Sequence, residues 1–327
     1  MAITCPVNRG AAEPLCLCHF PISFFAVVMG LCGLAIAWQQ MGTFLGLSPL
    51  LGTGLALLAT VVFILAAAAY GVKLAFFPGS VREEWANPIR ISFFPTVSIS
   101  LLLLSYVWIA VPELSLWIWA IGAVLQIVLT LAVLNSWIHQ AHYQPGHANP
   151  SWFIPVVGTI IAPISGVHHG FIEISWFYFS VGILFWMVIL NIVIYRLFFH
   201  EPLPQRLTPM LFILLAPPSV GFISYTMLVG GVDVFARILY DTALFMAVLL
   251  IMNGIRFYRC GFFLSAWAYS FPLAAFTIAT MRMSRLTDSA FFKGMAFVLI
   301  GLLSVLLLWL FVRTLKIVLS GQVFRPE

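Results

Sequence analysis

Hydrophobic residues along the chain gather into ten long runs, separated by short segments that carry proline, glycine and charge. Each run has about 18–25 residues, the length that an α-helix needs to cross ~30 Å of hydrocarbon. The ten-residue alternating stretches of a membrane β-barrel are absent. The pattern predicts an all-α polytopic membrane protein with ten transmembrane helices, at residues 20–40, 50–74, 89–110, 113–138, 152–168, 173–198, 208–230, 232–256, 261–282 and 289–318.

The connections between these runs are short and rich in turn residues, as at Phe77-Pro78-Gly79-Ser80 and Glu201-Pro202-Leu203-Pro204. None is long enough to form a soluble domain. We therefore expect one transmembrane domain at residues 20–320. A cytoplasmic N-terminal tail at residues 1–19 and a short C-terminal tail at residues 321–327 flank it.

Composition supports a lipid-facing exterior. Hydrophobic residues make up 63% of the chain and charged residues 8%, and the mean hydropathy is +1.09. A soluble domain carries roughly 25% charged residues, so most of this exterior must face lipid. The net charge of +5 is dispersed at the segment ends, whereas a nucleic-acid-binding protein gathers its cations on one face. We expect no nucleic-acid partner.

The lysines and arginines predict the orientation, because cytoplasmic loops of membrane proteins carry an excess of them. With ten spans both termini lie on one side. That side holds eleven cations: Arg9, Lys73, Arg82, Arg90, Arg196, Arg206, Arg256, Arg259, Arg313, Lys316 and Arg325. The other side holds four: Arg237, Arg282, Arg285 and Lys293. We expect a multi-pass protein of the plasma membrane, the bacterial inner membrane, with both termini in the cytoplasm.

Prolines divide the spans into two classes. They occur near or within the odd-numbered spans, at Pro21, Pro95, Pro155, Pro163, Pro217, Pro218 and Pro272, and are absent from the interiors of the even-numbered ones. A proline inside a helix removes a hydrogen bond and bends the helix. In lipid the freed carbonyl needs a neighbouring helix or water as its partner. The alternation predicts five helical hairpins, with kinked odd helices around a central pore and straight even helices outside.

The odd spans lack ionisable side chains. No Asp, Glu, Lys, Arg or His occurs within residues 20–40, 91–110, 152–167, 208–230 and 261–281. Ion-coupled transporters usually place an ionisable group at mid-membrane, so the pattern favours a passive path. Cation channels use rings of carboxylates or carbonyl loops. A chain with excess positive charge and no acidic ring is more consistent with anions as the cargo.

Two groups of residues invite a metal or catalytic interpretation. Cys16, Cys18 and His19 form a Cys-x-Cys-His segment without the second ligand pair that zinc sites have. His139 and His142, with His147 nearby, leave open a membrane enzyme or metal-binding protein, although this loop has no carboxylate. No Ser/His/Asp set or phosphate-binding loop stands out. We expect no enzyme activity, no metal and no cofactor.

Four segments resemble helix signatures of the tellurite-resistance/dicarboxylate transporter family. They correspond, in order, to its first, fifth, seventh and ninth helices: Ser23–Gly30 (SFFAVVMG), Asn149–Pro155 (NPSWFIP), Ala216–Phe222 (APPSVGF) and Trp267–Leu273 (WAYSFPL). The resemblance extends from residue 20 to about residue 320. The family includes bacterial tellurite-resistance proteins, plant guard-cell slow anion channels, and fungal malate and sulfite carriers.

The resemblance implies a homotrimer of ten-helix protomers, each with a pore that its odd helices line. It also implies that a phenylalanine of the ninth helix blocks the pore, and Phe271 is the match here. The first helix departs from the bacterial pattern, because Val28 stands where a mid-helix proline is expected, so Gly30 is the candidate for a bend. The pore-lining or kink candidates are Gly30, Pro95, Pro163, Pro217, Ser219, Trp267, Pro272 and Ala275.

These observations predict a gated passive anion channel that conducts small inorganic anions such as chloride or nitrate. The alternative is a secondary carrier, proton-coupled or uniport, for C4-dicarboxylate, sulfite or tellurite-related anions. The expected partners are the conducted anions, membrane lipid and two further copies of the chain.

Overall fold

The computed structural model describes residues 16–46 and 48–324, and all regular secondary structure in those ranges is helical, with no strand. Ten helical spans in the described residues are long and apolar enough to cross a membrane, and each overlaps one of the ten predicted spans. The prediction of an all-helical, multi-pass chain with ten spans is therefore confirmed. Residues 1–15 and 325–327 of the two predicted tails lie outside the described residues.

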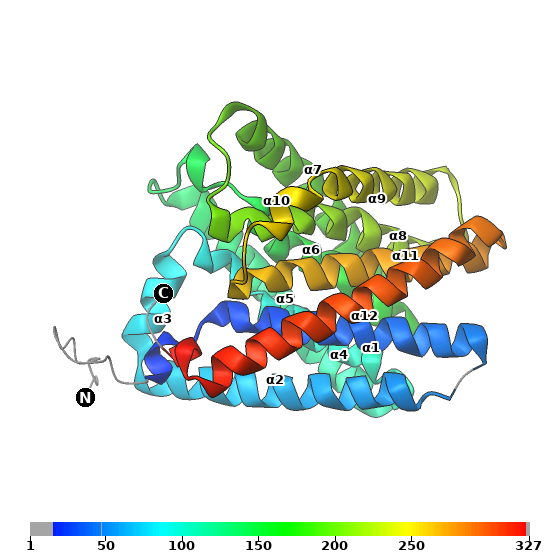
Figure 1. Ribbon diagram of the computed structural model, residues 1–327, viewed down its shortest axis with the longest axis horizontal. Helices are drawn as coiled ribbons and strands as arrows, with labels where there is room; N and C mark the ends of the chain where they lie inside the picture. The colour runs from blue at the N-terminus through cyan, green and yellow to red at the C-terminus, as the bar shows by residue number, and fades with distance from the viewer. Residues whose placement is uncertain (1–15, 47, 325–327) are drawn as a thin grey trace.

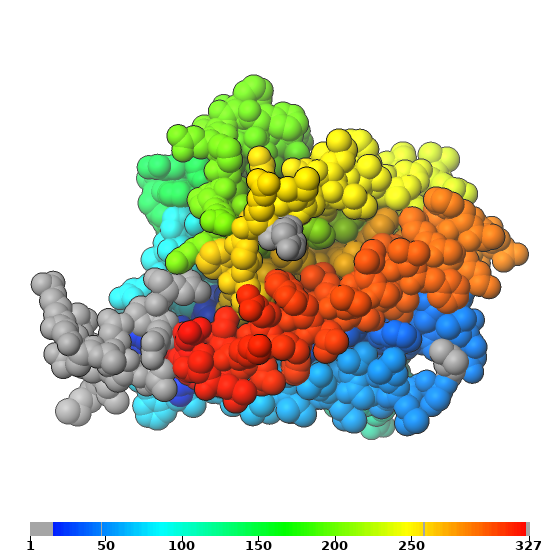
Figure 2. Space-filling model, in the orientation of Figure 1, coloured from blue at the N-terminus to red at the C-terminus, as the bar shows by residue number. Residues whose placement is uncertain are grey.

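The five even-numbered spans are single uninterrupted helices. They are α2 (Leu50–Phe76), α5 (Pro112–His139), α7 (Ile172–Phe199), α9 (Val234–Met252) and α12 (Ala290–Leu319). Proline occurs in them only at the first turn of α5, where its missing N–H has no intrahelical partner to lose. Only 22–33% of the residues in their most apolar stretches are buried. Figure 2 shows α12, orange to red, crossing one face between α2 and α9.

Each odd-numbered span, in contrast, begins as a 3-10 helix and continues as an α-helix. The five pairs are η2 (Ile22–Phe24) with α1 (Phe25–Leu45), η3 (Arg90–Phe93) with α4 (Thr96–Val107), η5 (Pro150–Trp152) with α6 (Phe153–His168), η6 (Gln205–Leu215) with α8 (Ala216–Val229), and η7 (Leu264–Tyr269) with α11 (Ser270–Thr287). In these spans 72–94% of the residues in the corresponding stretches are buried. We call the two classes the inner and outer helices.

The prolines of the inner helices mark where the 3-10 segment gives way to the α-helix. Pro95 is the N-cap of α4, and Pro217 lies in the first turn of α8. Pro272 is the third residue of α11. At these positions a proline loses no intrahelical hydrogen bond. Pro163 alone lies deep inside an inner α-helix, in α6.

Short helices complete the end of the molecule where the described chain begins and ends. They are η1 (Leu17–His19), α3 (Pro78–Ala86), η4 (Pro145–His147), α10 (Gly254–Tyr258) and η8 (Gln322–Phe324). The amide of Cys16 donates to the carbonyl of Phe324 at 3.2 Å. The first and last described segments are therefore held against each other, on the left of Figure 1.

Candidate functional site

The inner helices form a closed ring. α1 packs against α4, α4 against α6, α6 against α8, α8 against α11, and α11 against α1. Each inner helix also packs extensively against the outer helix that follows it in the chain. The axis of the ring is thus surrounded by five helices that touch their neighbours on either side.

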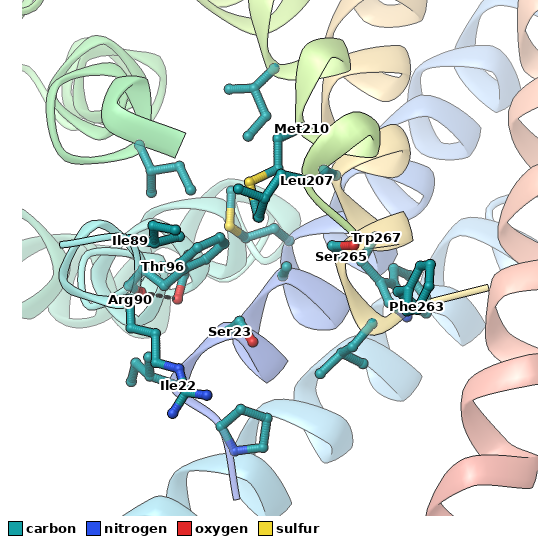
Figure 3. Close-up of a pocket in the computed structure, with 18 of the residues that line it drawn as sticks. Ile22, Ser23, Ile89, Arg90, Thr96, Leu207, Met210, Phe263, Ser265 and Trp267 are labelled. Carbon is teal, nitrogen blue, oxygen red and sulfur yellow. Dashed lines mark hydrogen bonds between the residues drawn. The ribbon is translucent and has the colours of Figure 1, made fainter. Parts of the chain in front are cut away.

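A cavity of about 470 Å³ occupies the ring at the end that holds the described termini. The 3-10 segments of the inner helices supply much of its wall, with Ile22, Phe93, Met210 and Trp267 among the lining residues. Figure 3 looks into this cavity, with Arg90 on one side and Phe263 and Ser265 on the other. The exposed cations Arg90 and Arg206 both lie at its rim. A mouth with these charges attracts anions.

A buried ion pair secures one wall of this cavity. Lys73 Nζ lies 2.9 Å from Glu84 Oε2, and both side chains are almost fully buried. Tyr70 donates to the same oxygen at 2.9 Å, and Lys73 also donates to the Phe20 carbonyl at 2.9 Å. These bonds tie α2, α3 and the chain segment before α1 together, and they leave the charges of Lys73 and Glu84 compensated.

Beyond the cavity, each inner helix presents one stripe of residues toward the axis. On each inner helix the stripe positions follow one another at intervals of four and then three residues, which keeps them on one helix face. The first layer consists of Met29, Ile99, Val157, Ala216 and Phe271. The second layer consists of Gly33, Leu103, Ile161, Val220 and Ala275. The third layer consists of Ile36, Tyr106, Ile164, Ile223 and Ile278.

A second, much smaller cavity of about 30 Å³ lies among the second and third layers. Adjacent layers are one helical turn apart, about 5–6 Å. Apart from Gln40 and Tyr106, the described residues that line this cavity are apolar or glycine, and none is charged. The path along the axis is therefore narrow and uncharged through the second and third layers.

Phe271 lines both cavities. It is the only aromatic residue of the first layer, and 8% of its surface is exposed. A Cβ added at Gly33, on the neighbouring helix α1, would stand 3.9 Å from the Phe271 ring. The ring thus lies between the wide and the narrow part of the axis, with space on either side of it.

The structure separates the other candidates into two groups. Trp267 and Pro272 line the large cavity, and Ala275 lines the small one. The candidates that line neither cavity are Gly30, Pro95, Pro163, Pro217 and Ser219.

Two of these five have a local structural role. Gly30 lies inside the continuous helix α1, where a Cβ would collide with Ser270 of α11, so it permits close helix packing. Ser219 donates to the Leu215 carbonyl of its own helix at 2.7 Å.

Sequence reasoning missed most of the residues that line the path, such as Met29, Ile99 and Ile161. It also missed the polar residues Gln40 and Tyr106 at the far end of the small cavity. The sequence signal that could have found the lining residues was their recurring spacing of four and three residues on the odd-numbered spans.

The histidines considered for a metal site are engaged in local contacts. His139 Nδ1 lies 3.0 Å from the Asn135 carbonyl, and His147 Nδ1 accepts from the Gln144 amide at 3.2 Å. The rings of His142 and Tyr143 are tilted against each other, with 4.3 Å between their centroids. No cluster of three potential metal ligands occurs among the described residues.

Comparison with known proteins gives one family match, and it covers almost the whole chain. Residues 19–315 match the SLAC1 family, described as voltage-dependent anion channel.

Individual relatives come from plants, archaea and bacteria. The chain is 29% identical over 308 residues to the S-type anion channel SLAH3 of Arabidopsis thaliana, which covers 91% of this chain and 48% of the relative. It is 24% identical over 332 residues to an uncharacterized transporter of Methanocaldococcus jannaschii, covering 94% and 96%. It is 26% identical over 261 residues to the tellurite resistance protein TehA homolog of Haemophilus influenzae, covering 78% of each. The chain thus spans about half the length of the plant relative.

Proposed function

Because the chain belongs to the voltage-dependent anion channel family, which is not a family of enzymes, we propose that it is a gated passive channel for small inorganic anions such as chloride or nitrate. The path follows the axis of the ring of inner helices. Phe271 closes it in the state described here.

The observation that carries this proposal is the position of Phe271 between the two cavities. A large apolar ring at the start of a narrow apolar path blocks ions sterically. It also keeps water out, since a constriction lined by apolar side chains dewets. Removing the ring would take away the side chain that stands between the two cavities.

Charge supports anions as the cargo. Arg206 stands exposed at the rim of the large cavity, and Glu84, the acidic residue in its wall, is paired with Lys73. The narrow part has no charged lining residue. An anion is therefore attracted to the mouth and bound weakly inside, which suits conduction. The lining of the small cavity also supplies no charged group that could couple transport to protons.

One observation favours the alternative of a secondary carrier for C4-dicarboxylate, sulfite or tellurite-related anions. The large cavity of about 470 Å³ has room for an organic anion, and two arginines stand at its rim. A carrier would hold such an anion there before moving it. Transport of radiolabelled malate, sulfite or tellurite into liposomes that show no anion current would establish the carrier.

The decisive experiment replaces Phe271 by alanine and records currents in planar bilayers with chloride or nitrate as the permeant anion. We expect Phe271→Ala to raise the current by roughly tenfold or more, because a steric and dewetted barrier is removed. Phe276→Ala is the matched control, since Phe276 is buried in the same helix but lines neither cavity. Equal currents in the two variants would place the gate elsewhere.

A second measurement separates a channel from a proton-coupled carrier. In the Phe271→Ala variant the reversal potential should follow the anion gradient alone when a pH gradient is imposed. A reversal potential that moves with the proton gradient would support the symporter.

The proposal includes a homotrimer with both termini in the cytoplasm, in the plasma membrane of a bacterium. The described termini share one end of the molecule, and the excess of lysine and arginine at that end supports a cytoplasmic location for it. Light scattering after size exclusion in detergent tests the trimer. Labelling of single cysteines introduced at Gly170 and Ser320 of a variant without its native cysteines tests the orientation.

A further inference from the structure

A polar ring closes the inner-helix path at the end opposite the described termini. The second layer and the apolar residues of the third layer separate it from the large cavity, and Tyr106 belongs both to the third layer and to this ring. Each inner helix contributes one member, and the five are Gln40, Tyr106, His168, Thr226 and Arg282. Gln40, His168 and Arg282 continue the axial stripes of α1, α6 and α11 by four residues, so they lie on the same face as the residues that line the path. We call these five residues the outer ring.

Contacts among these side chains join neighbouring helices. Arg282 Nε of α11 donates to Thr226 Oγ1 of α8 at 2.5 Å. The rings of Tyr106 and His168, on α4 and α6, have centroids 5.8 Å apart. Arg282 interacts electrostatically with both Tyr106 and His168, and Gln40 approaches the Tyr106 hydroxyl. The outer ring is therefore one cluster around the axis, and Gln40 and Tyr106 connect it to the small cavity.

The charge of Arg282 has no counterion among the described residues. In the described ranges the sole ion pair within 4.0 Å is Lys73–Glu84, at the other end of the molecule. Asp233, at the same end as Arg282, instead caps α9 by accepting from the Ala236 amide at 2.9 Å, and it also accepts from Tyr225. The hydrogen bond from the Ala236 amide, with that from Tyr225, lowers the pKa of Asp233.

A second guanidinium increases the positive charge of this end. Arg285 lies one turn further along α11, where its Nη2 donates to the Gln40 carbonyl at 2.6 Å. Its charge also lacks a carboxylate partner among the described residues. Arg282, which is half-buried, uses its Nε for Thr226, and its other N–H groups make no hydrogen bond to a described residue. A partly buried cation without a counterion is energetically costly.

We propose that the outer ring binds a small monovalent anion, such as chloride or nitrate, between Arg282 and the hydroxyl of Tyr106. The free guanidinium N–H groups supply charge-assisted hydrogen bonds, and the hydroxyl supplies a neutral donor. One uncompensated charge and a few neutral groups give weak binding, which lets the anion move on. The ring thus gathers anions at the entrance opposite the termini. This role in conduction rests on the proposed function.

The first test measures currents in the Phe271→Ala background with 10 mM chloride on both sides. Arg282→Gln should reduce the current of anions entering from the outer-ring side by roughly fivefold, because the local anion concentration falls. Current in the opposite direction should change much less. At 1 M chloride the difference should disappear, since the Debye length is then about 3 Å. Arg282→Lys, which keeps the charge, should restore most of the current.

Arg237→Gln is the matched control. It removes the same charge at the same end, but from an exposed position on the outer helix α9. Size-exclusion profiles of all variants establish that they are folded. If Arg282→Gln and Arg237→Gln give equal currents at 10 mM chloride, the proposed role of the outer ring in conduction is wrong.

The second test does not depend on conduction. Crystals of the unmodified protein grown with bromide should show an anomalous peak beside Arg282, and crystals of Arg282→Gln should not. If Phe271→Ala carries no anion current, the channel proposal fails while the bromide peak still decides the binding site. Absence of the peak from the unmodified protein overturns the site, whatever the currents show.

Discussion

The inner and outer helices reverse the rule that soluble proteins follow. Every inner span has a lower mean hydropathy than every outer span, yet the inner spans are the buried ones. In water the most apolar helix would be buried, but lipid tails are themselves apolar and give no such preference. The buried helices are the ones whose small residues and hydroxyls let neighbouring helices approach closely. Their prolines lie where a 3-10 segment gives way to an α-helix. The uniformly apolar outer helices are left on the outside, facing the lipid.

The inner helices themselves have two kinds of face, one toward neighbouring helices and one toward the axis. Phe271 and Phe276 of α11 represent the two kinds. Phe276 stacks on Tyr240 of α9 with 6.1 Å between ring centroids, whereas Phe271 borders two cavities.

The largest expected effect distinguishes these two faces. Phe276→Ala should lower the free energy of unfolding by about 4 kcal/mol, because truncation of a packed aromatic leaves a new cavity. Phe271→Ala should cost only about 2 kcal/mol, since space already exists on both sides of its ring. Denaturation in detergent, followed by tryptophan fluorescence, measures both. Equal losses would mean that Phe271 is an ordinary core residue.

The next effect concerns an outer helix that is not purely lipid-facing. Lys73→Met in α2 should lower the free energy of unfolding by about 3 kcal/mol, because Glu84 would remain buried without its partner. The double variant Lys73→Met/Glu84→Gln should recover most of this loss in the same assay. Failure of the double variant to recover would mean that the lysine acts through its bond to Phe20 instead.

Two glycines test close packing at a smaller magnitude. Gly30→Val should cost about 2 kcal/mol, because the new side chain would push α1 away from Ser270 of α11 and Trp267 of η7. Gly301→Val in α12 is the control, since nothing lies within 4 Å of a Cβ there. Thermal unfolding in detergent compares the two. A Gly30→Val protein as stable as the control would show that α1 and α11 can separate freely.

The smallest effect is expected on the lipid-facing side of an outer helix. Leu302→Ala should change the free energy of unfolding by no more than about 0.5 kcal/mol, as its side chain is 56% exposed. Its neighbour Leu303 is fully buried in the same helix, and Leu303→Ala should cost about 3 kcal/mol. Unfolding in lipid nanodiscs measures the difference. Similar losses of unfolding free energy in the two variants would contradict the division of α12 into a lipid-facing and a buried face.

The ten spans could be predicted because the length of an apolar run is fixed by the thickness of the bilayer. The two classes of span could be predicted because proline is tolerated only where its lost bond does no harm in lipid. The prolines did distinguish the two classes of span, but for a reason other than the expected bending of the odd helices. Pro95 and Pro217 mark junctions between 3-10 and α-helix, and only Pro163 lies deep within an inner α-helix.

The residues that line the path were harder to predict. A helix that is apolar on every side has no polar face, so its sequence does not show which side faces the axis. Phe271 is one of 30 phenylalanines and was chosen by family resemblance alone. Helix α3 was also missed, because its Pro78-Gly79 start reads as a turn, whereas proline is well suited to a first helical position.

The closed ring of neighbour contacts has a mechanical consequence. No inner helix packs substantially across the axis. Lateral pressure from the bilayer is therefore borne by the contacts between adjacent inner helices. At the joint of α1 and α11 the members already touch, because a Cβ at Gly33 would stand 2.6 Å from that of Ala274. The width along the axis is therefore set at the joints as well as by the lining, since Gly33 belongs to both.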